Sequence, residues 1–176
     1  DQNHSQGLNL PIDVFFRSIA EDQQEKGIGI IFSGTGSDGT RGIQAIKKAG
    51  GMVIVQDEKS AKFDGMPRSA IATGMVDYIC PPEDMPDVIL SYTSHPLIAK
   101  KKNHLPPISS EETDLTKIIA MLRSRTGVDF TYYKPSTVIR RLERRMGIVQ
   151  KNTLREYLEH LHDNPEEIHS LYKDLL

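Results

Sequence analysis

Short apolar runs alternate with helical patterns through the first half of the chain, and this alternation constrains the fold more than any other feature. The runs are GIGIIFS (27–33), MVIVQ (52–56) and VDYIC (76–80). Helical patterns flank them at about 11–24, 43–49, 66–73 and 82–92, the first with Ile12, Phe15, Phe16 and Ile19 at helical spacing. Gly50-Gly51 after the second pattern predicts a glycine C-cap. Continuous Ile- and Val-rich runs are typical of strands that helices cover on both faces. The pattern predicts an α/β unit with a parallel sheet and flanking helices over residues 1–93.

A glycine-rich turn, GTGSDG at 34–39, joins the first predicted strand to the next helix. Ligands and catalytic groups of parallel sheets collect at this end of the strands. The turn fits G-x-G-x-x-G and is followed by Asp57 at the end of the next strand, which gives a dinucleotide site as one hypothesis. Asp38 argues against it, because a carboxylate at the helix N-terminus would repel a bound phosphate by about a few kcal/mol.

Asp38 has two further interpretations. As a helix N-cap it would accept the amide of Thr40 or Arg41, a contribution of about 1 kcal/mol. Capping alone does not require the three glycines of the turn, which indicate positive φ angles or the close approach of another segment. The alternative is a turn that projects Asp38 from the rim of the sheet.

Longer stretches around this turn resemble a known family. SGTGSDGTRGIQAIKKAGG, VIVQDEKSAKFDGMPRSAIATG and VDYI, with PIDVFFRSIAEDQ upstream, are similar to the C-terminal half of the catalytic domain of chemotaxis protein-glutamate methylesterases (CheB type). The resemblance covers about residues 4–93. It implies that Asp38 is the acid of a Ser-His-Asp triad, which orients the His and stabilises its imidazolium.

The resemblance also implies roles for residues around Asp38. The amide of Thr35, where the family has Met, and the adjacent Gly36 would face the substrate oxyanion. Met66 and Arg68 of GMPRS would lie at the rim of the site, with Arg68 near an acidic substrate; a solvated Arg after a Pro-started helix is the other interpretation.

The triad is incomplete within these residues. The family's Ser and His precede the matched region, no G-x-S-x-G turn occurs, and Ser33 and Ser37 would need a base. His4 is expected to be solvated. We therefore expect this segment alone to be inactive.

The second half has a different character. Residues 94–112 mix prolines, three lysines and a serine-acid cluster, which predicts a linker. Residues 113–176 contain four helical patterns, with a capping box at Thr153 and Glu156 and helix starts at Pro135 and Pro165, and predict a small antiparallel all-α bundle. On the second pattern, Arg140, Arg141, Arg144 and Arg145 lie opposite the apolar positions. This arginine face suits an acidic partner or plain solvation.

The block TGVDFTYYKPSTVIRRLERRM, followed by LREYLEHLHDNPEEIHSLYKDLL, resembles the N-terminal helical domain of chemotaxis receptor methyltransferases (CheR type). The resemblance implies that Arg141, Arg144 and Arg145 face the catalytic domain and the glutamate-rich receptor. The domain that binds S-adenosylmethionine is not among the matched residues, so no cofactor is expected in this segment.

Composition and charge limit the remaining classes of function. Residues 1–93 carry a formal charge of −5 and residues 94–176 one of +3, giving −2 overall. The +3 half has no aromatic residue among its arginines, which disfavours nucleic acid. No apolar run is long enough to insert into a membrane, and a single Cys80 favours a cytoplasmic setting.

Together the two resemblances imply part of a longer, bifunctional chemotaxis protein. Its expected partners are the methylated cytoplasmic helices of chemoreceptors and the other domains of the same chain. A non-catalytic adaptor that binds acidic receptor helices through the arginine face, and the dinucleotide-binding enzyme, remain as alternatives.

Overall fold

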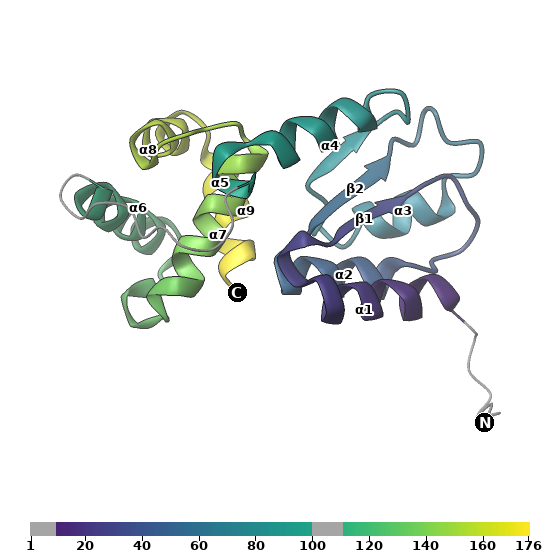
Figure 1. Ribbon diagram of the computed structural model, residues 1–176, viewed down its shortest axis with the longest axis horizontal. Helices are drawn as coiled ribbons and strands as arrows, with labels where there is room; N and C mark the ends of the chain where they lie inside the picture. Colours follow the sequence, from purple (N-terminus) through teal and green to yellow (C-terminus); the bar gives the residue numbers. More distant parts are fainter. Residues whose placement is uncertain (1–9, 100–110) are drawn as a thin grey trace. The chain divides into compact units, whose positions relative to one another are not determined.

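The computed structural model describes residues 10–99 and 111–176, and contacts divide the chain into two compact units, with the boundary in the sequence between Met85 and Pro86. In the first unit the elements are α1 (Pro11–Gln23), the 3-10 turn η1 (Gln24–Lys26), β1 (Ile28–Ile31), α2 (Thr40–Ala49), β2 (Met52–Gln56), α3 (Gly65–Ile71) and β3 (Tyr78–Cys80). In the second they are α4 (Met85–Ser94), which starts at the boundary, α5 (Pro96–Ala99), α6 (Glu111–Thr126), the 3-10 turn η2 (Phe130–Tyr132), α7 (Pro135–Ile148), α8 (Leu154–Asp163) and α9 (Pro165–Leu175) (Figure 1).

The first unit is a parallel sheet in the order β1-β2-β3, with Ile30, Ile54 and Tyr78 in register. All residues of the central strand β2 are buried, as its continuous apolar run predicts. Both crossovers run in the same direction across the sheet, and their right-handedness places α2 and α3 on one face. The predicted α/β class is therefore confirmed, as is the all-helical character of the second unit.

The core of the first unit lies between the sheet and its helices. Its buried members come from strands and helices alike: Ala20, Ile31, Ile43, Ile46, Val53, Val55 and Ala70. Gly50 ends α2 with φ of 94°, and its N–H donates to Lys47 O, which confirms the predicted glycine cap.

Helix α1 is rotated relative to the apolar face predicted for it. Phe15 is 59% exposed, whereas Asp13 and Ala20 are buried. The inward face therefore includes a carboxylate, and the backbone of α2 provides its partner, because Gly42 N–H donates to Asp13 Oδ1 at 2.7 Å.

Helices α1 and α2 approach closely at Gly42. A Cβ at this position would lie 2.6 Å from Phe16 Cβ and 3.2 Å from the Cα of Asp13. Both atoms belong to the opposing helix and cannot move without shifting it.

We predict that Gly42→Ala destabilises the protein by about 1–3 kcal/mol, because the added methyl would force α1 away from α2. The sign of the change in the free energy of unfolding is diagnostic, since Gly→Ala at an unhindered helical position stabilises a protein by about 1 kcal/mol. Urea unfolding followed by circular dichroism measures the difference, and a more stable variant would contradict the packing described.

The helical unit has its own core, built from α6 to α9 and the turn η2. Its buried apolar residues are Ile118, Leu122, Phe130, Val138, Leu142, Met146, Tyr157, Leu161, Ile168, Leu171 and Leu175. Pro135 and Pro165 start α7 and α9 as predicted. Thr153 Oγ1 accepts the Glu156 N–H, while the Glu156 carboxylate reaches the amide of Asn152, one residue earlier than in the predicted box.

The unit boundary falls earlier than the predicted end at residue 93, because the end of α4 packs within the second unit. A Cβ at Gly147 of α7 would meet Tyr92 and Ile98, and the Gln150 amide donates to Ser91 O. Part of the predicted linker is therefore structured, because Pro96–Ala99 forms α5. His95, the residue before α5, is buried, and this burial lowers its pKa. The middle of that linker, 100–110, lies outside the described residues.

Among the residues that the structure describes, arginines of α7 form buried ion pairs inside the helical unit. Arg145 of α7 forms a two-pronged pair with Glu167 of α9, which also accepts the Tyr157 hydroxyl at 2.8 Å. Arg144 pairs with Asp174, seven residues after Glu167 on the same face of α9. These contacts join α7, α8 and α9 through buried charges.

We predict that Glu167→Ala destabilises the helical unit by about 3–5 kcal/mol, because Arg145 and Tyr157 would lose their partner while remaining buried. The control is Glu166→Ala, an exposed carboxylate in the same first turn of α9, which should cost at most about 1 kcal/mol. Equal effects in urea unfolding would show that the buried pair has no special role.

Candidate functional site

The GTGSDG turn and the segment after β2 lie together at the carboxyl ends of β1 and β2. Gly34 N–H donates to Phe63 O at 2.9 Å, and Met66 N–H donates to Gly34 O at 2.9 Å. Ser33 reinforces the junction, because its Oγ accepts the Phe63 N–H and its own N–H donates to the Gln56 side chain. Two segments about 30 residues apart in sequence therefore form one rim.

The glycines of the turn have the roles that their spacing predicts. Gly36 and Gly39 have φ of 84° and 91°, which side chains with a Cβ rarely adopt. Gly34 has an ordinary φ but a close neighbour: a Cβ there would overlap the sulfur of Met66, whose flexible side chain would have to move.

Asp38 accepts hydrogen bonds from three backbone amides. Ile12 N–H donates to Oδ2 at 3.1 Å, whereas Asp13 N–H at 3.0 Å and Gly39 N–H at 2.8 Å donate to Oδ1. The amides of Ile12 and Asp13 belong to the first turn of α1, where amides lack partners within their own helix. Asp38 therefore caps a helix that precedes it by some 25 residues.

Asp38 does not cap α2, the helix that follows it, so the interpretation in which it accepts the amide of Thr40 or Arg41 is wrong. The N-cap of α2 is Gly39, which has no side chain to cap with, and Thr40 N–H donates to Ser37 O. The physical reason is the positive φ of Gly39, which turns the chain so that Asp38 faces α1.

The carboxylate of Asp38 keeps capacity for a further donor. A carboxylate has about four lone-pair sites, and the amides use three, two on Oδ1 and one on Oδ2. Asp38 is also only half-buried. The arrangement can therefore hold one more N–H group in a fixed direction.

The same contacts disfavour a dinucleotide. Amides at the start of α2 that would bind a pyrophosphate are occupied, since those of Gly39, Thr40 and Gly42 donate to Asp38, Ser37 and Asp13. Asp57, the expected ribose ligand, accepts two amides and the Ser60 hydroxyl of its own turn. The hydroxyl bond lowers the pKa of Asp57. We find no observation that favours the nucleotide hypothesis.

The other predicted rim residues lie close to one another but differ in environment. Thr35 and Gly36 are exposed, and Met66 is half-buried against Gly34. Arg68 is exposed and pairs with Asp64 at 2.7 Å and Glu58 at 3.2 Å. Its charge is thus shared with two carboxylates of the same rim.

A nucleophile and base do not meet within the described residues of the first unit. Ser33 Oγ accepts a backbone N–H, and neither Ser33 nor Ser37 has a described histidine in the same unit. His4, the histidine of that stretch, lies outside the described residues.

The structure does not present Arg144 and Arg145 at the surface, as the receptor-facing role predicted for them would require. Their exposed fractions are 3% and 6%, and both are paired with carboxylates of α9. The reason is that α9 packs against the side of α7 that carries Arg144 and Arg145. Arg141 remains half-buried, and burial, together with the neighbouring arginines, lowers its pKa.

Sequence reasoning missed Asp13, Glu167 and Asp174. In each case the available signal was an acidic residue beside the apolar positions of an amphipathic helix. Asp13 adjoins Ile12, and Glu167 and Asp174 adjoin Ile168 and Leu175. A carboxylate at such a position needs a buried donor.

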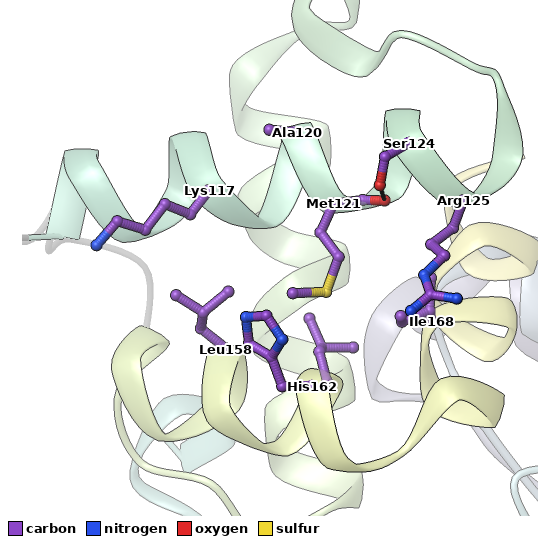
Figure 2. Close-up of a pocket in the computed structure, with 9 residues that line it drawn as sticks. Lys117, Ala120, Met121, Ser124, Arg125, Leu158, His162 and Ile168 are labelled. Carbon is purple, nitrogen blue, oxygen red and sulfur yellow. Dashed lines mark hydrogen bonds between the residues drawn. The ribbon is translucent and has the colours of Figure 1, made fainter.

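A pocket of about 430 Å³ opens in the helical unit (Figure 2). Figure 2 shows Met121, Leu158 and Ile168 from three helices directed toward it, with Lys117 and Arg125 along α6. Its lining has no carboxylate and contains no residue predicted for the site. The lining residues are apolar or basic apart from Ser124: Lys117, Ala120, Met121, Ser124, Arg125, Leu158, Leu161, His162 and Ile168.

The residues that the structure describes hold neither a cluster of metal ligands nor a membrane-spanning helix. No group of three or more His, Cys, Asp or Glu side chains gathers there as metal ligands would. None of the described helices is long and apolar enough to cross a bilayer.

Comparison with protein-family models divides the chain in the same order as its two units. The model described as CheB methylesterase matches residues 1–89, and the model described as CheR methyltransferase, all-alpha domain, matches residues 113–176.

Individual relatives agree with this division. A Rhodobacter capsulatus protein titled "Uncharacterized 104.1 kDa protein in hypE 3'region" is 39% identical over 96% of this chain and 20% of its own length. The "Probable protein-glutamate methylesterase" of Borreliella burgdorferi is 48% identical over 46% of this chain and 22% of its own length. The chain thus spans about a fifth of these relatives.

A solved structure is also similar, the Thermotoga maritima CheB methylesterase catalytic domain. It is 37% identical, with a TM-score of 0.42 over 43% of this chain and 40% of that one. By the family matches, the chain belongs to the CheB methylesterase family over residues 1–89 and joins it to a CheR-type all-alpha region over residues 113–176.

Proposed function

We propose that residues 1–93 form the C-terminal half of a protein-glutamate methylesterase domain in a longer chain, and that Asp38 is the acid of its Ser-His-Asp triad. The observation that carries this proposal is the state of the Asp38 carboxylate. Three backbone amides fix it at the strand-end rim, and it keeps room for one further donor. An imidazole N–H is the donor that triad chemistry requires.

In the proposed reaction, Ser and His come from chain that precedes residue 1. The His takes the Ser proton as the Ser oxygen attacks the ester carbonyl of a methylated glutamate. The proton then passes to the departing methoxide, which leaves as methanol, and water releases the glutamate carboxylate from the acyl-enzyme in the same way. Asp38 holds the His tautomer and stabilises the imidazolium in both stages.

The rim residues would serve the substrate. Thr35 and Gly36 are exposed residues of the turn, and their backbone amides are proposed as oxyanion donors, for which a side chain is not needed. Met66 and Arg68 would border the substrate. Because Arg68 is shared with Asp64 and Glu58, its attraction for an acidic receptor is expected to be moderate.

For the helical unit we propose the role of a CheR-type N-terminal region that contacts chemoreceptor helices in the cytoplasm. Of the three arginines predicted to face the receptor, Arg141 is the one whose side chain is not fully buried. S-adenosylmethionine belongs to this proposal only as the cofactor of a catalytic domain elsewhere in the parent chain. The pocket between α6, α8 and α9 does not fit S-adenosylmethionine. Its lining has basic side chains and no carboxylate, so it offers no acidic group to bind the ribose hydroxyls or to neutralise the sulfonium charge.

We predict that Asp38→Asn in the full-length protein lowers esterase kcat by about two to four orders of magnitude, because the His would lose its correct tautomer. Methanol release from methylated receptor measures the rate, and circular dichroism checks the fold. The matched control is Asp57→Asn, a carboxylate at the neighbouring strand end whose contacts are confined to its own turn. Residues 1–176 alone should release no methanol.

Either of two results would reject this function. One is a folded Asp38→Asn protein with unchanged turnover. The other is an equal loss in the Asp57 control, which would mean that the change of charge alone is responsible.

A further inference from the structure

We propose that Asp13 is a positioning residue for Asp38, so that the esterase site depends on a second carboxylate that never touches the substrate. The inference rests on the proposed function and deepens it. It starts from a circuit of hydrogen bonds between the first turns of α1 and α2.

The circuit has two links in opposite directions. Asp13 N–H of α1 donates to Asp38 Oδ1 at 3.0 Å, just before α2 begins. Gly42 N–H of α2 donates to Asp13 Oδ1 at 2.7 Å. Each helix start therefore binds a carboxylate carried by the other segment, and Asp13 takes part in both links.

Asp13 has little freedom to move. It is 1% exposed, and Gly42 approaches so closely that a Cβ on it would lie 3.2 Å from the Cα of Asp13. A buried carboxylate costs stability unless it is hydrogen-bonded, so the Gly42 bond holds Asp13 in place. The two amides of α1 that bind Asp38 belong to Asp13 and the residue before it, so they are fixed with it.

Removing the Asp13 carboxylate would release this end of α1. Asp38 would keep its charge but lose the fixed direction of its remaining acceptor site. Misplacing a catalytic group by about 1 Å can cost about 100-fold in rate. Because Asp13 is buried and has no surface with which to contact the substrate, the loss should appear in kcat and leave KM nearly unchanged.

A second signature follows from electrostatics. A well-placed carboxylate stabilises imidazolium and raises the pKa of the catalytic His. In Asp13→Ala the pKa of that His should fall, so the acid limb of kcat/KM should move to lower pH. Asp38→Asn should move the limb in the same direction and further. If the variant merely contained less folded protein, kcat/KM would fall equally at every pH and the acid limb would stay at the same pH.

The test is a double-mutant cycle in the full-length protein, with Asp13→Ala, Asp38→Asn and the pair together. Asp13→Ala should lower kcat about 10- to 100-fold with KM within about twofold, and should have no further effect in the Asp38→Asn background. Asp13→Asn is the rescue variant, because its Oδ1 can still accept the Gly42 amide; it should retain kcat within about threefold.

The proposal is overturned if Asp13→Ala leaves kcat unchanged, or lowers it equally with and without Asp38. If Asp13→Ala does not fold, Asp13→Glu replaces it, since its extra methylene would displace α1 from Gly42 while keeping the charge. Equal kcat in the Asn and Glu variants would then reject positioning. A different result, no loss in Asp38→Asn itself, would reject the esterase function and not Asp13 in particular.

Discussion

The exchange of carboxylates between the starts of α1 and α2 is the interaction on which the site depends. Asp38 binds the amides of α1, and Asp13 binds an amide of α2. Each link uses donors that a helix start leaves unpaired, so the arrangement stabilises both helices while it fixes a charged side chain at the rim. Stability of the fold and orientation of Asp38 therefore have the same cause. Two glycines make this possible, because Gly39 in the turn redirects the chain and Gly42 in α2 allows the helices to touch.

The helical unit uses buried charge differently. Arg144 and Arg145 face carboxylates of α9 inside the bundle, and their role there is to join helices. Breaking a buried pair is costly, whereas a solvated pair contributes little. An arginine-rich face on one helix is therefore ambiguous until the helix that packs against it is known. Here the acidic residues of α9 cover Arg144 and Arg145, and they leave Arg140 exposed and Arg141 half-buried.

Much of the architecture could be predicted from local sequence. The buried strand β2, the glycine cap of α2 and the Pro-started helices each depend on residues within one element, and each is confirmed. The significance of the glycines around Asp38 was also predictable, since positive φ and close approach are local demands. Family resemblance added the chemistry that spacing alone left undecided.

The errors arose where an element's partner is distant in sequence. The donors to Asp38 precede it by 25 and 26 residues, so a local rule selected Thr40 and Arg41 instead. The inward rotation of α1 follows from Asp13 and Gly42, and the attachment of α4 to the second unit follows from Tyr92 near Gly147. Periodicity identifies a face, but the opposing surface decides what that face contains.

The most direct test of this account is a crystal structure of the full-length protein at high resolution. We expect an imidazole nitrogen from chain upstream of residue 1 within about 3.2 Å of the Asp38 carboxylate, with the amides of Ile12 and Asp13 still bound to it. A structure in which those amides have left Asp38, or in which an arginine or lysine takes the place of the imidazole, would contradict it.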